Sequence, residues 1–393
     1  MAKLIDITGR ALSGEWGIDD ETGDGVPVLR TTNFTNEGVV NYNDVITRTI
    51  TKKNIDQKFL RKGDIIIEKS GGSDKFPVGR VIYFDGDENT YLFNNFTGLL
   101  RVKDKKIWNS KYVFYSLFAN YRRGGTRAFE NKTTGIHNLK TDDFVSRFDI
   151  YELPIKEQNL ICEKLDKIYN IIKLRRQELL ILDDLIKARF VEMFGDVIHN
   201  DRKWECKQFS DITTSRLGKM LDTKHQTGTC KYPYLANFNV QWFRFELGNL
   251  NEMDFNEKER EEFCLEDGDL LVCEGGEIGR CAVWHNQIKK CFFQKALHRV
   301  RCNQDIILPD YLSWWFKYNC ENGGFTAIEG AKATISHLTG TKMKMLDVTV
   351  PPIKLQEQFV DIIHQVDKSK VAVQKALDET KMLFDSLMQE YFG

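Results

Sequence analysis

Two long stretches of the chain place mainly apolar residues at alternating steps of four and three. In the first stretch the steps fall on Ile161, Leu165, Ile168, Ile172, Arg175, Leu179, Leu182, Ile186, Arg189 and Met193. In the second they fall on Phe359, Ile363, Val366, Lys370, Val373, Leu377, Thr380, Phe384, Leu387 and Tyr391. A period of 3.5 residues held for this length is typical of helices that pack on each other. The alternative is two amphipathic helices on separate cores, but the matched phase and length favour a coiled-coil pair.

Both stretches are bounded in the same way. Pro154 and Pro352 stand just before them, where a helix tolerates proline. Both stretches close on Phe-Gly, and Gly195 is a natural C-cap. The sequence therefore predicts two long helices of similar length, antiparallel if a two-fold axis relates the halves of the chain.

The helix motif is one of several landmarks that occur twice in the same order. "VPVLRTTNF" resembles "YPYLANFNV", "KGDIIIEKSGG" followed by "VGR" resembles "DGDLLVCEGGEIGR", and "GIHNL" resembles "TISHL". Pro154 and Pro352 are 198 residues apart, and the other landmarks have similar offsets. This period is too long for a solenoid and indicates the duplication of one domain plus one helix.

Each copy begins with a strand-rich module. "GDIIIE" and "GDLLVCE" are apolar runs after a Gly-Asp turn signal, which predicts buried strands, and "VGRVIYF" and "IGRCAVW" predict the strands that follow. "YVFYSLFANY" and "PDYLSWWFKYN" have helical spacing. We therefore expect an α+β fold with a pseudo-two-fold duplication. Two mixed α/β domains, residues 1–150 and 196–348, are joined by the long helices of residues 151–195 and 349–393.

Composition adds few constraints. The 393 residues exceed one ordinary core, and 41% hydrophobic with 29% charged residues is typical of a soluble globular protein. Neither a membrane span nor a signal-peptide core is visible, so we expect a cytoplasmic protein. Nine cysteines without a CxxC pair indicate reduced, mostly buried thiols rather than a metal site. Since the net charge is −1, any contact with DNA requires local patches or partner subunits.

Two stretches combine basic and aromatic residues as nucleic-acid surfaces do. Residues 121–140 contain Arg122, Arg123, Arg127, Lys132 and Lys140, and residues 285–301 contain Lys289, Lys290, Lys295, Arg299 and Arg301. Such side chains contact phosphates or read guanine. A solvated charged face is the alternative, and it loses weight because each half of the chain has such a stretch.

The glycine-rich segments after "GDIIIE" and "GDLLVCE" supply further candidates. Lys69, Ser70, Arg80, Glu274 and Arg280 flank these glycines, which permit a close approach of the backbone to a ligand. A structural turn is an equal alternative. Thr31, Asn33, Asn237 and Asn239 lie in the segments after the Pro-led strands and suit base readout, with a polar turn as the alternative. Lys332 completes the candidate set.

Catalytic motifs are missing from the sequence. It has no P-loop, no HExxH, no Asp/Asn-Pro-Pro-Tyr/Phe methyltransferase motif and no convincing nuclease set. His137 aligns with Ser336 in the other copy, which argues against a duplicated catalytic histidine. We expect no catalytic residue, no metal site and no directly bound cofactor.

These motifs together resemble the specificity subunits of type I restriction-modification systems. The resemblance rests on the starts at Pro154–Gln158 and Pro352–Gln358, the helices that end in Phe-Gly, and the preceding "GD…GR" modules, and it covers essentially the whole chain. It implies a non-catalytic adaptor in which two target-recognition domains read the halves of a split DNA sequence and two antiparallel helices set the gap.

The resemblance also implies partners. Two methyltransferase subunits would bind S-adenosylmethionine, and a translocating restriction subunit would use ATP and Mg²⁺. The two modules differ in side chains, so the target should be asymmetric. Two other classes compete with this interpretation. A catalytic methyltransferase or nuclease would modify DNA alone, and a coiled-coil scaffold without DNA binding would be insensitive to reversal of its basic stretches.

Overall fold

The computed structural model describes residues 1–133, 136–221, 228–326 and 337–393. The chain divides into two compact units. The first unit comprises Met1–Arg176 and Lys375–Gly393, and the second comprises Gln177–Gln374. Lys332 and residues 334–336 of the "TISHL" segment lie outside the described residues.

The first unit opens with a strand-rich part. Its elements are β1 (Ala2–Lys3), α1 (Leu4–Thr8), β2 (Leu12–Ser13), β3 (Ile18–Asp19), β4 (Val26–Leu29), η1 (Thr31–Asn33), β5 (Ile46–Thr49), η2 (Asp56–Lys58), β6 (Ile65–Glu68), β7 (Ser70–Gly72), β8 (Val81–Tyr83), β9 (Leu92–Phe93), β10 (Thr97–Leu100), α2 (Ser110–Arg122), η3 (Gly125–Phe129), β11 (Glu130–Thr133), β12 (Ile136–Leu139), α3 (Thr141–Arg147) and β13 (Asp149–Ile150). The strands form sheets ordered β2-β10-β6-β8, β3-β5-β4-β9, β11-β12-β7 and β1-β13.

The second unit repeats much of this order. Its elements are β14 (Glu205–Gln208), α5 (Phe209–Ile212), β15 (Thr213–Leu217), β16 (Lys231–Leu235), η5 (Asn237–Asn239), β17 (Val240–Gln241), β18 (Arg244–Phe245), β19 (Asn251–Asp254), α6 (Glu257–Phe263), β20 (Leu270–Cys273), β21 (Cys281–Val283), β22 (Phe292–Phe293), β23 (Leu297–Cys302), α7 (Pro309–Glu321), α9 (Gly340–Lys344) and β24 (Asp347–Val350). Sheet β15-β23-β20-β21 corresponds to β2-β10-β6-β8, and the parallel pair β16-β22 corresponds to β4-β9.

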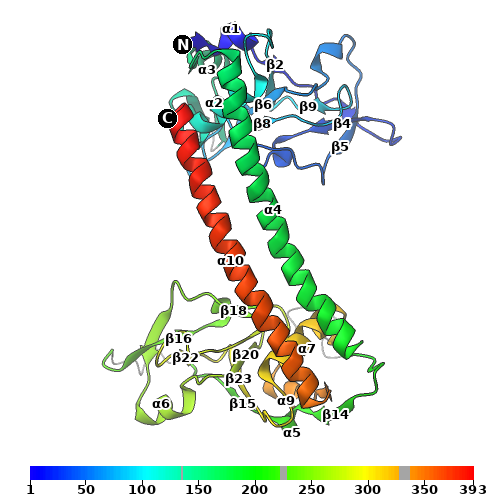
Figure 1. Ribbon diagram of the computed structural model, residues 1–393, viewed down its shortest axis with the longest axis vertical. Helices are drawn as coiled ribbons and strands as arrows, with labels where there is room; N and C mark the ends of the chain where they lie inside the picture. The colour runs from blue at the N-terminus through cyan, green and yellow to red at the C-terminus, as the bar shows by residue number, and fades with distance from the viewer. Residues whose placement is uncertain (134–135, 222–227, 327–336) are drawn as a thin grey trace. The chain divides into compact units, whose positions relative to one another are not determined.

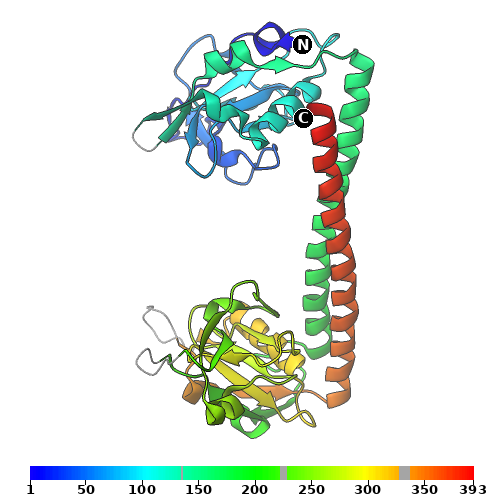
Figure 2. The ribbon, with the colours of Figure 1, turned by 90° about the vertical axis from the view of Figure 1, so that its left-hand side faces the viewer.

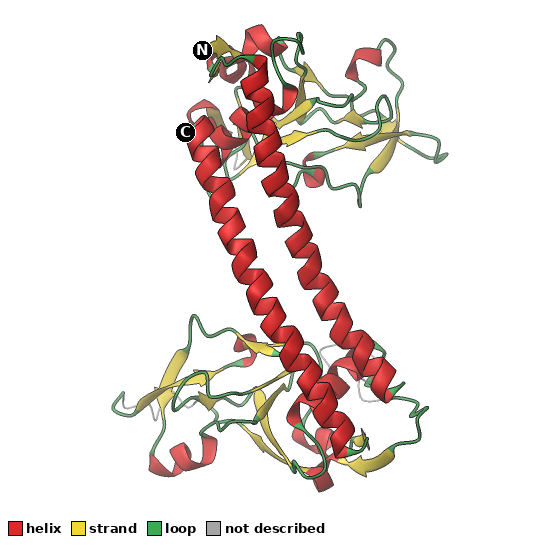
Figure 3. Cartoon of the chain, viewed as in Figure 1, coloured by secondary structure: helices red, strands yellow, loops and turns green. Residues whose placement is uncertain are grey.

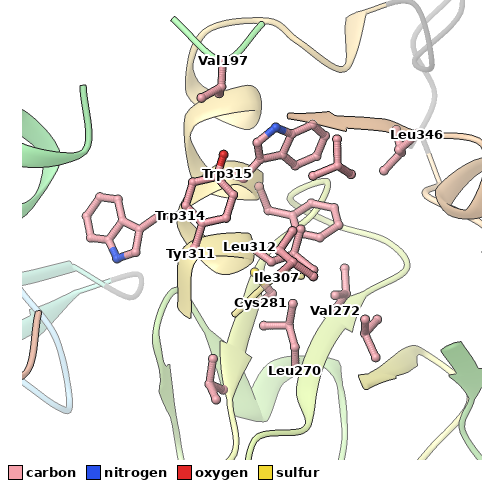
Figure 4. Packing of buried hydrophobic residues seen from close by; sticks show 14 of the residues in the cluster. Val197, Leu270, Val272, Cys281, Ile307, Tyr311, Leu312, Trp314, Trp315 and Leu346 are labelled. Atoms are coloured by element: carbon pink, nitrogen blue, oxygen red, sulfur yellow. The ribbon is translucent and has the colours of Figure 1, made fainter. Parts of the chain in front are cut away.

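The apolar runs of the sequence lie where the pattern predicted. "GDIIIE" and "GDLLVCE" contain the fully buried strands β6 and β20, and the next runs contain β8 and β21. The helical segments form α2, which packs on β8, and α7, which packs on β21 (Figure 1). In the second unit Leu312 on the buried face of α7 points toward the strand residues Cys281 and Leu270, whereas the ring of Trp315 lies on the side of Leu346 (Figure 4). The expected α+β fold with two strand-rich domains and two long helices is therefore confirmed.

The two long helices are α4 (Ile155–Phe194) and α10 (Ile353–Phe392). Figure 3 shows each as an unbroken helix. In the first unit Lys164 lies over the ring of Tyr391, and Tyr169 packs on Phe384. Residue numbers therefore rise along α4 as they fall along α10, so the helices are antiparallel there, and the C-terminal end of α10 lies beside the start of α4 (Figure 2).

The second unit pairs the other ends of the same helices. Asp183 forms an ion pair with Lys370, and Phe190 and Phe194 pack edge-on against Phe359. The direction is again antiparallel. The ring contacts join the helix pair to one core with α7, because Phe194 also packs on Tyr311.

The predicted seam residues differ in burial along the helices. Buried are Ile161, Leu165, Ile172, Ile186, Phe359, Ile363, Val366, Leu377 and Phe384. Partly exposed are Ile168, Leu179, Leu182, Val373 and Leu387. Arg175 lies between the helices of the first unit, where its guanidinium donates to the backbone oxygen of Ala376 and the hydroxyl of Thr380.

The buried row shifts by one position at the C-terminal end of each helix. Phe190 and Phe194 are buried in α4, whereas Arg189 is exposed and pairs with Glu192. In α10 Met388, the counterpart of Phe190, is buried. An α-helix drifts about 20° per heptad relative to a 3.5-residue repeat. Over the last turns the buried side therefore faces the strand-rich part of its unit, where α7 or α2 packs.

Gly195 ends α4 in the left-handed conformation, with φ of +73°. Its N–H donates to the backbone oxygen of Val191 at 2.8 Å. A Cβ at this position would lie 2.1 Å from Oδ1 of Asp201. Both the conformation and the close approach require glycine here, which explains the Phe-Gly ending of the first helix.

All nine cysteines are free thiols; Cys206 is exposed, and the other eight are buried or partly buried. Burial raises the pKa of the Cys291 thiol to about 12 and also raises the pKa of Cys281. Within the described ranges, no three His, Cys, Asp or Glu side chains are grouped to hold a metal ion. No described helix is long and apolar enough to cross a membrane.

Candidate nucleic-acid interface

Asn33 fixes the segment that follows β4 from the inside. Its side chain is 1% exposed, and its Oδ1 accepts the N–H of Arg30 at 3.0 Å. Its Nδ2 donates to the backbone oxygens of Asn41 and Asp44, both at 3.0 Å. The carboxamide is therefore used to shape the loop between β4 and β5, which agrees with the polar turn given as the alternative for this segment.

Asn239 makes the same contacts in the second unit. It is also 1% exposed, accepts the N–H of Ala236 at 2.9 Å and donates to the backbone oxygen of Glu246 at 2.8 Å. The two loops therefore share one internal scaffold although their sequences differ. A shared scaffold allows the surface side chains of each loop to vary without loss of the fold.

Arg80 joins the same loop to the central sheet of the first unit. Its guanidinium donates to the backbone oxygens of Thr31 and Phe34, both at 2.9 Å, and lies 3.4 Å from Oε1 of Glu68. Burial raises the pKa of Glu68, although Arg80 opposes this effect. The arginine of the "GR" motif therefore holds the loop that contains Thr31 in place through hydrogen bonds to its backbone.

Arg280 has the corresponding role in the second unit. It donates to the backbone oxygen of Asn237 at 3.1 Å and to Oδ1 of the same residue at 2.6 Å. Nδ2 of Asn237 donates in turn to the backbone oxygen of Gly275 at 2.8 Å. The predicted site residues Asn237 and Arg280 are thus brought together at the glycine-rich segment.

The aspartate of each "GD" motif forms a buried ion pair that the sequence analysis missed. Asp64 accepts Nε and Nη2 of Arg101 at 2.8 and 2.6 Å. Asp269 accepts Nε of Arg301 at 2.7 Å, and this contact raises the pKa of the arginine. Arg301, counted in the basic stretch, therefore has its charge compensated within the sheet. The signal was available, because an arginine follows each "GD" motif by a similar spacing.

Lys69 stands at the end of β6, beside the glycine-rich segment. Its N–H donates to the backbone oxygen of Phe96, and its own backbone oxygen accepts the N–H of Leu139, both at 2.8 Å. The ammonium group is half-buried and donates to Oγ of Ser13 at 3.0 Å. Burial lowers the pKa of Lys69, although Asp142 opposes this effect.

Glu274 has the same backbone position in the second unit. Its N–H donates to the oxygen of Ala296 at 3.0 Å, and its oxygen accepts the N–H of Leu338 at 2.8 Å. These bonds match those of Lys69. The two units therefore present opposite charges at one equivalent position next to a glycine-rich segment.

The arginines near the end of α2 face other parts of the first unit. Arg122 pairs with Asp385 at 2.7 Å, and Arg123 donates to the backbone oxygen of Phe392. Arg127 is exposed and donates to backbone oxygens after β7, at Asp74 and Lys75. The structure thus places Arg122 and Arg123 against α10 and Arg127 near the glycine-rich segment.

The remaining predicted residues divide by exposure. Lys289, Lys290 and Lys295 are exposed. Arg299 is half-buried and donates to the backbone oxygens of Glu262 and Cys264, which end α6. Ser70 belongs to β7, and Lys132 belongs to β11. Direct contact between DNA and any of these residues stays a prediction.

A strand-rich domain is present twice in the chain, and a long helix follows each copy. The sequence profile of the Type I restriction modification DNA specificity domain matches residues 2–182 and 201–380. The chain belongs to this family. It is therefore the DNA specificity component of a type I restriction-modification system, as its resemblance to that family predicted.

Curated and solved relatives agree with this assignment. The specificity subunit of the EcoKI type I restriction enzyme of Escherichia coli K12 is 23% identical over 424 residues, covering 98% of this chain and 86% of that subunit. The crystal structure of the S subunit from M. genitalium has a TM-score of 0.58 at 16% identity and covers 100% of this chain and 95% of that one. A chain from a structural study of complex assembly and conformational transition of the type I R-M system has a TM-score of 0.59 at 14% identity, covering 100% and 96%.

Family membership shows which roles belong to this chain and which belong to the other subunits. The specificity component is non-catalytic and carries no cofactor, because cofactors belong to the methyltransferase and restriction subunits with which it assembles. The predictions that this chain is not an enzyme, binds no cofactor directly and works with these partners are confirmed.

Proposed function

We propose that the chain reads a split, asymmetric DNA target with two heads, residues 1–150 and 196–348. The observation that carries this proposal is one loop scaffold present twice with different chemistry on it. Asn33 and Asn239 make the same internal bonds, whereas Lys69 stands where the second unit has Glu274. Equal scaffolds with unequal side chains support two half-sites of different sequence.

The candidate DNA contacts have two roles in this proposal. Exposed cations, namely Arg127, Lys289, Lys290 and Lys295, contact phosphates and orient each head, whereas Lys69 and Glu274 face base edges. Other candidates do not touch DNA in this proposal but hold the loops in place through hydrogen bonds to the loop backbone: Asn33, Asn239, Arg80 and Arg280. The residues that touch DNA and those that shape the surface are then different sets.

The helices of residues 151–195 and 349–393 serve as the spacer between the heads. Two methyltransferase subunits and the restriction subunits assemble on this chain, and we place the complex in the cytoplasm, where DNA is available to it. The near-zero net charge supports a division in which partner subunits supply much of the non-specific attraction to DNA.

The test is the methylation pattern of DNA from cells that express this chain with its methyltransferase subunit. We expect a split motif with N6-methyladenine on both strands, absent when this chain is omitted. A soluble assembled complex that methylates no motif would contradict the proposal and favour a scaffold. DNA methylation by the purified chain alone would contradict it differently, since it would indicate a catalytic protein.

Shortening both helices by one heptad should change the gap between the half-sites and leave their sequences unchanged. The segments 176–182 and 371–377 are suitable, because they lie between the Arg175–Thr380 contact and the Asp183–Lys370 ion pair. Seven residues correspond to about 10 Å of helix, or about three base pairs. Methylome sequencing of the double deletion measures the gap. A change in half-site sequence would show that the helices are not a spacer, and deletion from one helix alone is the control that should impair assembly.

A further inference from the structure

An ion pair ties the strand-rich part of each unit to a long helix. In the first unit Nη1 of Arg122, on α2, lies 2.7 Å from Oδ1 of Asp385 on α10. In the second unit Nζ of Lys187, on α4, lies 2.7 Å from Oε2 of Glu321 on α7. The long helix provides the acidic residue, Asp385, in the first unit and the basic residue, Lys187, in the second.

The two pairs occupy equivalent positions. Tyr112 of α2 packs on Phe392 with ring centroids 5.2 Å apart, and its counterpart Tyr311 of α7 packs on Phe194 at 4.8 Å. Arg122 lies ten residues after Tyr112, as Glu321 lies ten residues after Tyr311, so these two positions are equivalent. Asp385 lies seven residues before Phe392, as Lys187 lies seven residues before Phe194, so these two are equivalent as well. The interaction is therefore present in both units with its charges exchanged.

The apolar residues between the long helices are similar in the two halves of the chain, unlike the charged residues. Ile161 and Leu165 of α4 have Phe359 and Ile363 as counterparts in α10, and all four side chains are buried. Because the halves arose by duplication, two first halves or two second halves from different copies present similar apolar seams. Apolar packing alone therefore permits pairs of like halves as well as the native pair of unlike halves.

We propose that the exchanged ion pairs make each half accept only the unlike half. If two first halves paired, Arg122 of one copy would meet Lys187 of the other. If two second halves paired, Glu321 would meet Asp385. Each like pair thus places two repulsive contacts where the native pair has two attractive ones, and like charges in contact select against the wrong partner.

A third ion pair acts in the same direction. Lys370 of α10 pairs with Asp183 of α4 in the second unit. In a pair of second halves, the position of Asp183 would be taken by its counterpart Lys381, so two cations would meet. The partner that these charges exclude is an identical half from a second copy of this chain, and the chain closes on its own two different heads. This inference does not depend on which DNA the heads read.

The test uses the whole folded protein, cut once at a protease site inserted between the exposed residues Arg202 and Lys203. The cut protein is taken apart in urea, dialysed to allow reassembly, and weighed by native mass spectrometry, which separates pairs of like halves from pairs of unlike halves. The wild-type protein should reassemble as unlike pairs, with like pairs reduced about tenfold or more below their random share.

The decisive variant combines Lys187→Asp with Glu321→Lys. It keeps an attractive pair at both native positions, now in the same orientation, and makes both kinds of like pair attractive as well. We expect the share of like pairs to rise towards the random value, and pairs of first halves to rise most, because Lys370 and Lys381 still repel each other in pairs of second halves. Arg122→Glu with Asp385→Lys has the same logic and serves as the second variant. Lys187→Arg with Glu321→Asp keeps the signs and is the matched control.

Two results would overturn the inference. Like pairs in the cut wild-type protein at their random share would show that the charges do not select. Exclusive unlike pairing in both charge-exchanged variants would show that selection lies in other contacts. Melting temperatures of the uncut variants close to the wild-type value establish that the native pairs still form.

Discussion

Replacing Gln158 by leucine should lower the free energy of unfolding of the first unit by about 3 kcal/mol, because three partly buried backbone groups lose their partner. Gln158 is 0% exposed. Its Oε1 accepts the N–H of Asn109 at 2.9 Å, and its Nε2 donates to the backbone oxygens of Ile107 at 3.0 Å and Leu153 at 2.8 Å. These bonds hold the start of α4 against the segment that leads into α2.

Gln356 makes the same three bonds in the second unit, to the N–H of Leu308 at 2.9 Å and to the backbone oxygens of Ile306 and Pro351 at 3.0 and 2.8 Å. Gln356→Leu should therefore destabilise the second unit by a similar amount. The glutamine four residues after Pro154 and four residues after Pro352 is explained by these contacts, since no other side chain supplies one acceptor and two donors in the same shape. It is not the glutamine of the second "EQ", because Gln358 is exposed.

Urea unfolding measures the loss, and hydrogen exchange of residues 106–111 and 305–310 assigns it to one unit. Glu157→Leu and Glu357→Leu are matched controls, because these neighbouring side chains are exposed and their replacement adds the same apolar group. If Gln158→Leu unfolds at the same urea concentration as Glu157→Leu, the three hydrogen bonds do not stabilise the unit. Faster exchange at residues 305–310 in Gln158→Leu would show that the two units are not stabilised separately.

The repeat predicted most of the fold because its signals are local. An apolar run after Gly-Asp is recognisable as a buried strand without knowledge of its neighbours, and the 3.5-residue period marks the long helices. The role of Gln158 is not local, because its partner Asn109 lies 49 residues away. The motif comparison matched Gln158 with Gln358, whereas the structure gives the equivalent bonds to Gln356. The motif showed neither this offset nor that the side chain points inward.

The end of each long helix shows a second limit of the pattern. Arg189 and Phe190 are adjacent, so both steps of three and steps of four from Ile186 lead to a plausible position. The choice falls on Phe190 because the rings of Tyr311 and Trp314 on α7 lie beside it. Only the tertiary fold brings these rings to the helix.

The sequence predicted the candidate site as a set of residue types. In the structure, several of these side chains point inward and bond to the protein itself rather than outward to a ligand. Asn33 and Arg80 have the chemistry of base readout, yet their polar atoms bond to the backbone of the segment that follows β4. Arg301 was counted as a free cation and pairs with Asp269. Amide and guanidinium groups serve loop structure and base recognition equally well, so composition could not separate these roles.

The position shared by Lys69 and Glu274 gives the sharpest test of recognition. In the first unit Gly98 lies beneath Lys69, and a Cβ there would be 3.5 Å from Cδ of the lysine. In the second unit His298 takes the place of Gly98, and burial lowers its pKa while Glu274 opposes this effect. The lysine stem thus packs over a glycine that has no side chain, whereas Glu274 has an imidazole as its neighbour. The two surfaces are built for different hydrogen-bonding partners.

Lys69→Glu should change the first half-site and leave the second unchanged. A lysine donates to the acceptors of guanine, whereas a carboxylate accepts from the amino group of cytosine, and a good base contact contributes about 1–3 kcal/mol of discrimination. We therefore expect the original first half-site to lose about ten- to a hundredfold in affinity. Competition binding by the assembled complex, with one half-site altered at a time, measures this loss, and methylome sequencing identifies the new motif.

Lys106→Glu is the matched control, because Lys106 is an exposed lysine of the same unit and its replacement changes the net charge equally. If both variants weaken binding to all sequences alike, Lys69 contributes only to the general field around the DNA, since phosphate contacts carry no sequence information. Glu274→Lys reverses the experiment and should alter the second half-site alone. A change in both half-sites from either substitution would mean that the heads do not read independently, and the duplicated scaffold would then be one composite surface.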